Sequence, residues 1–434
     1  MNTQNIDTPK KWKFDYKWVI LFLCFLMNFV CLGFCSSNKG LYLTAITEAL
    51  DIERSLFSIN DSCRFIATAV INLFFGSLIM RFGFRKMAAF GFLCLIGSMV
   101  TYILADNIFV FYIGGTLLGF GLAFTTTTMT SSLIRRWFTK DIGKYTGLVF
   151  ASNGIGGAVA AQIITPIIYQ EGNPFGYRES YIFVTISVVI VGFLVVCLLR
   201  ERPTDAPITK VPVNKKTRGV IWDGLPFETV KRRPYFYLCA LCVFLTGFIL
   251  QNINGVYAAY MRDMGMGKEM LATISSIYAL ALTASKVFVG WAYDRFGLQK
   301  VLYMCHGATM IAFISLLLIT GIAPGTFAIA IVFCLTYAIA LPLETLVIPL
   351  IVNDLFGSAC NDKVLGIMAA MNYIGYATGS PLVNLFYDAF GTYRPVFLSF
   401  ALLMPVVSII FVFVIKASGK DKKAVIAAAE APAE

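Results

Sequence analysis

The stretch SKVFVGWAYDRFGLQK (residues 285–300) decides how this chain is built. It begins inside an apolar segment and ends in a short basic turn. Lys286 lies eight residues before Asp294, which is about 12 Å along a helix at 1.5 Å per residue. A charge at that depth in a membrane costs about 2.5–3.5 kcal/mol, so Lys286 marks a candidate functional site.

The composition of the chain predicts an all-α membrane protein. Of its 434 residues, 58% are hydrophobic and only 14% are charged, whereas about a quarter of a soluble protein is charged. Many apolar runs reach the ~20 residues that cross a ~30 Å hydrocarbon core as a helix. These runs are continuous rather than alternating, which excludes a β-barrel.

Twelve transmembrane helices are expected, arranged as two six-helix bundles. Their ranges are 18–47, 56–80, 87–105, 108–134, 145–169, 181–199, 235–260, 270–293, 301–322, 327–352, 364–386 and 395–415. The bundles therefore cover residues 18–199 and 235–415. Residues 1–17 form an N-terminal tail, residues 200–234 a polar linker, and residues 416–434 a C-terminal tail expected to be disordered.

The basic residues favour one orientation in the membrane. The tails and the even-numbered turns carry 27 Lys and Arg, and the opposite turns carry 5. The positive-inside rule places both termini in the cytoplasm. The net charge of +11 is then orientation charge rather than a nucleic-acid surface. The short loops suit a bacterial cytoplasmic membrane, and we expect a monomer.

Several classes of site are not expected. The 11 Cys form no CxxC pair and the only His is His306, which argues against a metal site. No GxxxxGK[ST] phosphate-binding loop occurs, so no nucleotide or other cofactor is expected. No set of nucleophile, base and orienting residue indicates an enzyme.

The chain contains an internal repeat of half its length. The turn GSLIMRFGFRK (76–86) recurs as GWAYDRFGLQK (290–300), an offset of 214 residues. A second pattern of Lys, Gly and Asn in residues 144–156 recurs in residues 363–375, an offset of 219. Two parallel repeats of this kind place a substrate near the membrane midplane, between the two halves.

At these residues the chain resembles the major facilitator superfamily. The superfamily signature, G-x-x-x-D-R-x-G-R-R/K, is matched in the second half at Gly290, Asp294, Arg295 and Gly297. The first half matches at Gly76, Arg81, Gly83, Arg85 and Lys86. Met80 stands where the family has Asp. In the family this Asp latches the cytoplasmic side by holding a neighbouring helix end, so a latch in the first half is in question.

Within the superfamily the chain is similar to the oxalate/formate antiporter and monocarboxylate transporter branch. It has Lys39 at the end of the first span, Lys286 where the branch has a cation, and an RRWF-type turn at 135–148. It departs from the branch at Leu282, where monocarboxylate transporters have a proton-coupling Asp. The span 364–386 also lacks the second cation of the oxalate antiporter. The resemblance therefore implies neither the substrate nor the coupling ion.

Five ionisable residues lie within the expected spans: Lys39, Asp61, Arg64, Lys286 and Glu344. Three cations against two carboxylates leave one positive charge in the membrane. An isolated buried cation would lose its proton or be expelled. A substrate carboxylate supplies the missing negative charge, which is the physical reason to expect an anionic substrate.

Each of these charges has alternative roles. Lys286 binds the anion or forms a structural ion pair, and Lys39 assists it or acts as an outer gate. Asp61 and Arg64, at i and i+3 on one helix face, form an ion pair. Glu344 pairs with Lys286 when the site is empty, or carries a proton. The neutral residues expected to line the site are Tyr42, Asn153, Asn254, Tyr257 and Asn372.

The sequence thus predicts a secondary transporter that moves a small organic anion, a mono- or dicarboxylate, by alternating access. Without a nucleotide site, a gradient must drive it, either by exchange with a counter-anion or by symport with protons. Two alternatives stay open. One is a carrier or exporter of a neutral or lipophilic solute, with the cations engaged in ion pairs. The other is a membrane sensor that binds its ligand without transporting it.

Overall fold

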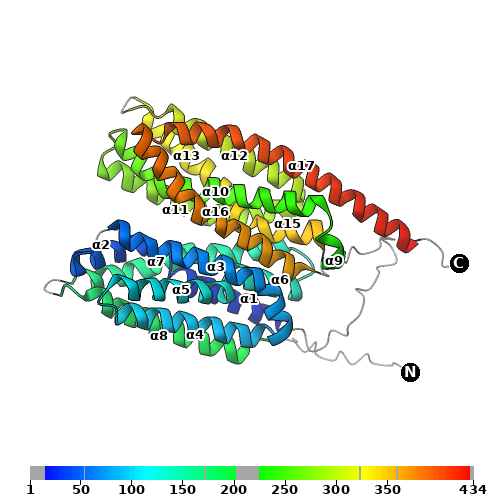
Figure 1. The fold of residues 1–434 in the computed structure, drawn as a ribbon, viewed down its shortest axis with the longest axis horizontal. Helices are drawn as coiled ribbons and strands as arrows, with labels where there is room; N and C mark the ends of the chain where they lie inside the picture. The colour runs from blue at the N-terminus through cyan, green and yellow to red at the C-terminus, as the bar shows by residue number, and fades with distance from the viewer. Residues whose placement is uncertain are drawn as a thin grey trace, which may run out of the picture.

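The computed structural model describes residues 15–52, 54–170, 173–201, 224–321, 324–357 and 360–430, and the side chains of a few residues within these ranges lie outside the description. Most of the expected N-terminal tail, linker residues 202–223 and the Lys39 side chain fall outside the described part. The described residues form helices and turns and no strand. Figure 1 shows two helical bundles side by side, and the described chain begins and ends at the same end of the pair, which we call the end that carries the termini.

The first bundle contains the helices up to Leu198. They are α1 (Lys17–Met27), the π-helical turn η1 (Asn28–Leu32), α2 (Lys39–Leu50), α3 (Arg54–Phe82), α4 (Phe84–Ile103), α5 (Ile108–Thr125), α6 (Thr127–Trp137), α7 (Ile142–Ile168) and α8 (Gly176–Leu198). The second bundle begins after the short helix α9 (Phe227–Val230). It contains α10 (Pro234–Asp263), α11 (Lys268–Phe296), α12 (Leu298–Leu318), α13 (Thr326–Ala340), α14 (Pro342–Thr345), α15 (Val347–Phe356), α16 (Asn361–Phe390) and α17 (Arg394–Glu430).

Three of the twelve expected spans are broken near their middle. The first is divided into α1–η1 and α2, the fourth into α5 and α6, and the tenth into α13, α14 and α15. The ranges 108–134 and 327–352 still correspond to candidate membrane spans, Ile108–Trp137 and Thr326–Thr345, and in the tenth span Leu341 and Leu346 keep right-handed helical backbone angles. The interruptions fall at Gly33 to Asn38, at Thr126 and around Pro342, where small, polar or proline residues weaken the helix.

The backbone repeats with the offset seen in the sequence. Gly83 and Gly297 precede α4 and α12 with φ of 82° and 81°, a left-handed conformation that favours glycine. The first span of each half also ends in the left-handed region, at Asp51 with φ 52° and at Gly265 with φ 91°. The two halves thus use equivalent turns at equivalent places, which supports the interpretation of two parallel repeats.

The bundles contact each other mainly through two helix pairs, α3 with α16 and α7 with α11, and to a smaller extent through α6 with α15 and α16. Glycines allow these pairs to approach closely. A Cβ atom on Gly147 of α7 would lie 2.4 Å from the Lys286 carbonyl oxygen of α11. One on Gly366 of α16 would lie 2.3 Å from the Asn72 carbonyl oxygen of α3. Small residues at helix interfaces serve this purpose in membrane bundles.

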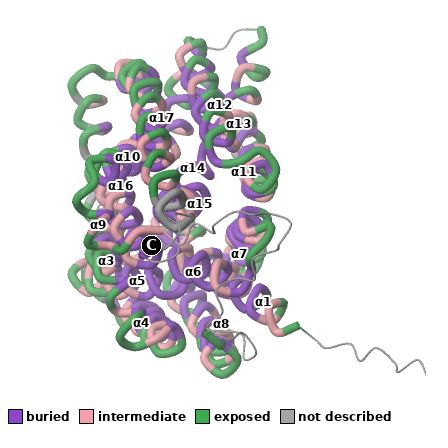
Figure 2. The backbone as a smooth tube through the Cα atoms, turned by 90° about the vertical axis from the view of Figure 1, so that its right-hand side faces the viewer, coloured by how far each residue is buried: buried purple, intermediate pink, exposed green. Residues whose placement is uncertain are grey.

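The outer surface of the bundles is apolar. Among the described residues, nine helical stretches are long and apolar enough to cross a membrane, with α5 and α6 counted as one stretch and α13 and α14 as another. The other expected spans are α1 to α2, which is broken, and α11 and α16, which are 29 and 30 residues long. The apolar window of α8 is only 28% buried, against 61% for α10, so α8 faces the lipid. Figure 2, viewed towards the end that carries the termini, shows buried residues gathered on the inner sides of the helices.

The C-terminal tail differs from its expected disorder. Helix α17 continues without interruption to Glu430. Its extension is anchored where Ser418 Oγ donates a hydrogen bond of 2.8 Å to the Leu355 carbonyl oxygen, and where Arg233 Nε lies 3.0 Å from Asp421 Oδ2. The Ala-rich sequence that follows has high helix propensity. The expectation of disorder from residue 416 was therefore wrong up to residue 430.

Candidate functional site

A cavity of about 200 Å³ lies between the two bundles. Both bundles line it with polar residues: Asn28, Ser36, Arg64, Thr68, Thr127 and Asn153 from the first, and Gln251, Lys286, Glu344, Thr345, Tyr373 and Tyr376 from the second. Its apolar wall includes Leu32, Phe65, Leu122 and Phe150. We call it the central cavity. A mixed lining of this kind, shared by two repeats, is typical of a binding site for a small solute.

The broken helices meet the central cavity at their breaks. Asn28 lies in η1 and Ser36 in the turn after it; Thr127 begins α6, and Glu344 belongs to the short helix α14. Asn28 Nδ2 donates to Thr130 Oγ1 at 3.1 Å and so joins two of the broken spans. Interrupted helices at membrane depth expose polar backbone, which is tolerated where it lines a water-filled site.

Lys286 contributes a buried ammonium group that crosses from α11 to the other bundle. The residue is 6% exposed. Its Nζ donates to Asn153 Oδ1 at 2.6 Å and to the Phe150 carbonyl oxygen at 3.2 Å, both on α7. An ammonium has three N–H groups, and both of these acceptors are neutral. No described carboxylate lies within 4 Å of Lys286 Nζ, so no ion pair balances its charge there.

Arg64 brings a second cation to the central cavity from α3. The residue is 6% exposed, and its guanidinium donates to Ser36 Oγ. Its Nε lies 3.5 Å from Asp61 Oδ1, one helical turn away, without a hydrogen bond to a described residue. Asp61 itself is 40% exposed. The distance is long for an ion pair, and Arg64 is buried whereas Asp61 is partly exposed. The Asp61 carboxylate therefore screens the guanidinium only in part.

Glu344 is the carboxylate of the central cavity. It is 2% exposed, and its Oε2 has no hydrogen-bond partner among the described residues. The Glu344 backbone carbonyl accepts a hydrogen bond from Asn372 Nδ2 at 3.0 Å. Asn372 also donates to Tyr376 Oη at 2.7 Å and lines a smaller cavity of about 40 Å³ next to Glu344. Asn372 therefore holds this edge of the site in place.

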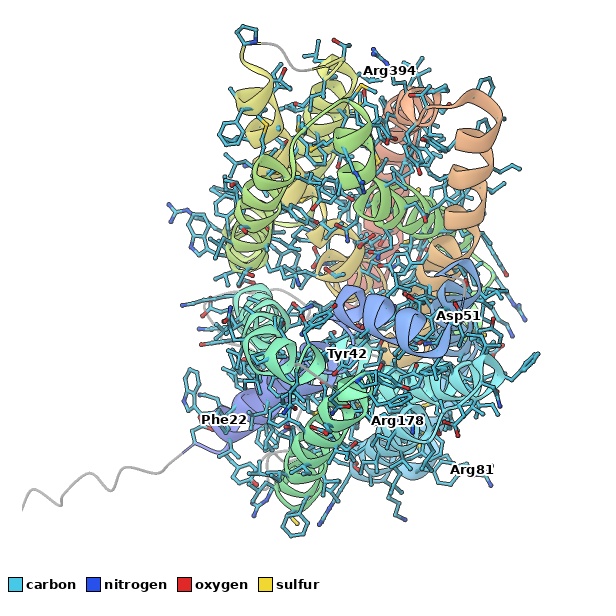
Figure 3. The ribbon with its side chains drawn as sticks, turned by 90° about the vertical axis from the view of Figure 1, so that its left-hand side faces the viewer. Phe22, Tyr42, Asp51, Arg81, Arg178 and Arg394 are labelled. Atoms are coloured by element: carbon cyan, nitrogen blue, oxygen red, sulfur yellow. The ribbon has the colours of Figure 1, made fainter. Side chains whose placement is uncertain are left out.

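Tyr42, another expected site residue, lies in a different cavity. This second cavity, of about 110 Å³, lies within the first bundle, and Tyr42 lines it together with Asp61, Tyr102 and Tyr181. Tyr42 Oη lies 2.6 Å from Ser180 Oγ, and its ring stacks on Tyr181 at 4.2 Å. Tyr42 lies on α2 and Asp51 directly follows it. Helix α2 runs along the side of the first bundle that faces the second (Figure 3).

Asn254 and Tyr257 of α10 lie inside the second bundle, outside the lining of the central cavity as described. Asn254 Oδ1 accepts a hydrogen bond of 2.9 Å from Tyr278 Oη. The Tyr257 ring packs 5.5 Å from that of Tyr278 and 5.4 Å from that of Phe333. Of the neutral residues expected from the sequence, Asn153 is the one that touches Lys286 directly.

The bundles are closed against each other at the end that carries the termini. Asp294 at the end of α11 accepts hydrogen bonds from the backbone N–H groups of Gly143, at 2.9 Å, and Lys144, at 2.7 Å. These N–H groups begin α7, so Asp294 caps the N-terminus of a helix in the other bundle. Gly290 lies against Gly143, since a Cβ atom on Gly290 would be 2.2 Å from the Gly143 carbonyl oxygen.

The first-half copy of this contact is built differently. Met80 replaces the carboxylate and is 62% exposed. Gly76 still lies against Lys363 at the start of α16, since its Cβ atom would be 2.5 Å from the Lys363 backbone. Asp362, in the first turn of α16, instead forms an ion pair of 2.6 Å with Arg136 of α6. The remaining signature residues, Arg81, Arg85 and Arg295, are exposed at this end, and Gly83 and Gly297 form its turns.

The hydrogen bonds and ion pairs between the bundles lie between mid-depth and the end that carries the termini, as far as the described residues show. Two ring contacts, from Phe65 to Tyr373 at 6.3 Å and to Tyr376 at 5.5 Å, lie near mid-depth. These contacts thus separate the central cavity from the end that carries the termini.

Comparison with known proteins gives a consistent result. The family model described as Major Facilitator Superfamily matches residues 21–358 and 239–434. The chain is 23% identical over 380 residues to the uncharacterized MFS-type transporter YcxA of Bacillus subtilis, covering 86% of this chain and 88% of YcxA. It is 24% identical over 281 residues to the sialic acid transporter NanX of Escherichia coli, covering 64% and 62%.

A more distant relative and a solved structure extend the comparison. The chain is 21% identical over 362 residues to monocarboxylate transporter 12-B of Danio rerio, covering 77% of this chain and 73% of that protein. The structure of the proton:xylose symporter XylE superposes with a TM-score of 0.73 at 13% identity, covering 92% of this chain and 96% of XylE. At that identity the match concerns the fold.

Proposed function

Because this chain belongs to the Major Facilitator Superfamily, we propose that it is a secondary transporter whose cargo is a small organic anion, a mono- or dicarboxylate. The bundles rock about the central cavity, so that it opens to one side of the membrane at a time. We infer from the bias of basic residues that the termini lie in the cytoplasm. On that orientation, the contacts of Asp294 with Gly143 and Lys144 close the carrier towards the cytoplasm.

One observation carries the proposal. Lys286 and Arg64 reach the same buried cavity from opposite bundles, and Lys286 has only neutral acceptors there. A buried charge without a counter-charge is unfavourable. A cargo carboxylate supplies the counter-charge and accepts charge-assisted hydrogen bonds from both cations. Since the cations come from different bundles, the anion also links the two bodies that must move together.

The size and walls of the cavity limit the cargo. A volume of about 200 Å³ holds a small acid rather than a polymer or a large lipophilic drug. The aromatic rings of Phe65, Phe150, Tyr373 and Tyr376 contact its carbon skeleton, and Asn28, Thr127 and Gln251 offer hydrogen bonds to hydroxyl or further carboxylate groups. The similarity to a monocarboxylate transporter and a sialic acid transporter agrees with a carboxylate cargo.

The proposal is tested by counterflow in proteoliposomes. Vesicles with purified protein are loaded with an unlabelled acid, and entry of the same radiolabelled acid is followed for lactate, oxalate, succinate, 4-hydroxybenzoate and sialic acid. We expect at least one of these carboxylates to exchange, and other carboxylates to compete better than xylose or choline. Exchange of xylose or choline with no effect of any carboxylate would contradict the proposal and favour a carrier of neutral or cationic solutes. Binding without exchange would favour a sensor.

Replacing Arg64 tests the second cation. We expect Arg64→Ala to raise the KM for the exchanged carboxylate by about 10- to 100-fold, because a charge-assisted hydrogen bond contributes about 1.5–3 kcal/mol. Arg64→Lys keeps the charge and should recover part of the loss. The control is Arg262→Ala, which removes an exposed arginine from the end of α10. A normal KM in Arg64→Ala would exclude Arg64 from cargo binding.

A further inference from the structure

The carboxyl group of Glu344 is the unusual feature of the central cavity. It is 2% exposed, its Oε2 has no hydrogen-bond partner among the described residues, and Lys286 Nζ is not within 4 Å of it. A buried carboxylate in that situation is strongly disfavoured, and it avoids the penalty by taking up a proton. The contacts of Asp294 with Gly143 and Lys144 separate the cavity that Glu344 lines from one end of the bundles.

The neighbours of Glu344 make it responsive to the charge of the cavity. The titratable groups whose charge acts on it or is affected by it are Lys286 and Tyr278 on α11, Tyr337 on α13, and Tyr373 and Tyr376 on α16. Of these, only Lys286 is a cation. Arg64 lines the same cavity from α3, and α10 contributes the neutral Gln251. Lys286 is therefore the one cation among them that can stabilise an ionised Glu344, beside the hydrogen bond between the Tyr376 hydroxyl and the Glu344 carboxyl group.

The backbone holds Glu344 at this place. It lies in the four-residue helix α14, between two breaks of the span. Its N–H donates to the Leu341 carbonyl oxygen at 3.2 Å, and its carbonyl oxygen accepts from Asn372 Nδ2 at 3.0 Å. Leu341 and Leu346, which flank α14, keep right-handed helical backbone angles. The side chain thus projects from a helix whose hydrogen bonding is locally disturbed at Pro342, which has no backbone N–H.

We propose that Glu344 is the proton-binding group that couples anion transport to a proton gradient, which makes the protein a proton–anion symporter. This inference rests on the proposed function, because the anion and the proton use the same cavity. When the cavity is open to the outside, a proton from water binds Glu344 Oε2 and the anion binds Lys286. On the inside the anion leaves, the proton passes from Glu344 to water, and the resulting carboxylate pairs with Lys286 during the return.

The charges balance in both moving states. In the loaded carrier the ammonium of Lys286 faces one anion, and Glu344 is neutral. In the empty carrier the same ammonium faces the Glu344 carboxylate. A carrier with an unpaired Lys286 carries a net buried charge and does not reorient readily. One proton therefore accompanies each monovalent anion. Asp61 is less suited to this role, because it is 40% exposed and lies beside Arg64 at 3.5 Å.

Glu344→Gln distinguishes the movement of the loaded carrier from the return of the empty carrier. Glutamine keeps the shape and the neutral state of Glu344 but cannot form a carboxylate, so the loaded carrier moves and the empty one does not. In proteoliposomes with the carboxylate that exchanges best, we expect the ratio of proton-driven accumulation to counterflow at equal pH to fall at least tenfold relative to the unmodified protein. We expect the acidification reported by enclosed pyranine, divided by the same counterflow rate, to fall by the same factor. Glu179→Gln, which removes an exposed carboxylate from α8, should change neither.

Two results would overturn the inference. The first is undiminished proton-driven accumulation by Glu344→Gln. The second is loss of counterflow by a correctly folded Glu344→Gln, which would make Glu344 a cargo-binding residue. If this variant fails to fold, the unmodified protein decides by its stoichiometry. One proton per anion in the pyranine assay supports the inference, and anion entry without protons refutes it. Absence of counterflow with every acid in the unmodified protein would instead refute the proposed function itself.

Discussion

Replacing Lys286 by alanine is expected to reduce uptake of the exchanged carboxylate by at least about 30-fold. The variant removes the cation that crosses between the bundles to Asn153 and Phe150. Loss of one partner of a buried charge pair costs about 2–5 kcal/mol, and each 1.4 kcal/mol is a factor of ten in binding. Uptake into proteoliposomes, normalised to the amount of folded protein, measures the effect.

The fold should survive this substitution. The acceptors left behind, Asn153 Oδ1 and the Phe150 carbonyl oxygen, line a cavity that water can fill. Lys286→Arg keeps the positive charge and should retain measurable uptake. Lys140→Ala removes an exposed lysine and is the control, with unchanged uptake expected. Carboxylate uptake by a well-folded Lys286→Ala protein at the normal rate would remove Lys286 from the binding site.

The second large effect is expected from Gly290→Ala, which prevents the bundles from closing at the end that carries the termini. The new Cβ atom would lie 2.2 Å from the Gly143 carbonyl oxygen, which is backbone and cannot move aside alone. Overpacking of this kind costs about 1–3 kcal/mol, and the two hydrogen bonds to Asp294 are lost with the contact. We therefore expect uptake to fall at least tenfold.

The conformational shift can be read from a native cysteine. Cys360 lies immediately before α16 at the closed end and is 5% exposed. In Gly290→Ala its labelling by a membrane-impermeant maleimide from that side should rise several-fold, as mapped by mass spectrometry. Gly307→Ala is a matched control, because a Cβ atom on Gly307 meets nothing within 4 Å. If Gly290→Ala labels and transports like this control, the closed contact does not limit the cycle.

Much of the fold could be predicted from the sequence because it follows from local rules. Apolar runs of about 20 residues set the helices, and the repeated turns 76–86 and 290–300 revealed the two halves before their glycine conformations were seen. Lys286 was identifiable because burying a charged lysine two helical turns inside an apolar run costs free energy unless the lysine has a binding role. These inferences use residues close together in the chain.

What the sequence did not reveal depends on contacts between distant segments. The interruptions at η1, Thr126 and α14 carry no strong local signal beyond small residues, threonines and Pro342, so the sequence did not place them. Gln251, Tyr373 and Tyr376 were not singled out, although they line the central cavity. Arg64 was expected as an ion-pair partner, and its place on the central cavity emerges only when α3 packs against α16.

The helical C-terminal tail and the contact at Met80 also depend on residues that are far apart in the chain. The sequence predicted a disordered tail around Ser418 and Asp421, but their partners Leu355 and Arg233 lie on other segments. Met80 left a first-half latch in question, and the Arg136–Asp362 pair joins residues that are far apart in the chain. Neither partner could be named without the tertiary structure.

The central claim, that buried cations recognise an anionic cargo, is tested most directly by calorimetric binding of an acid and its amide. The purified protein is titrated with the best-exchanged acid, for example 4-hydroxybenzoate, and with the corresponding carboxamide, which has nearly the same shape and no charge. We predict that the acid binds at least 100-fold more tightly than the amide, and that Lys286→Ala abolishes most of this difference. Equal binding of acid and amide by the unmodified protein would contradict the account.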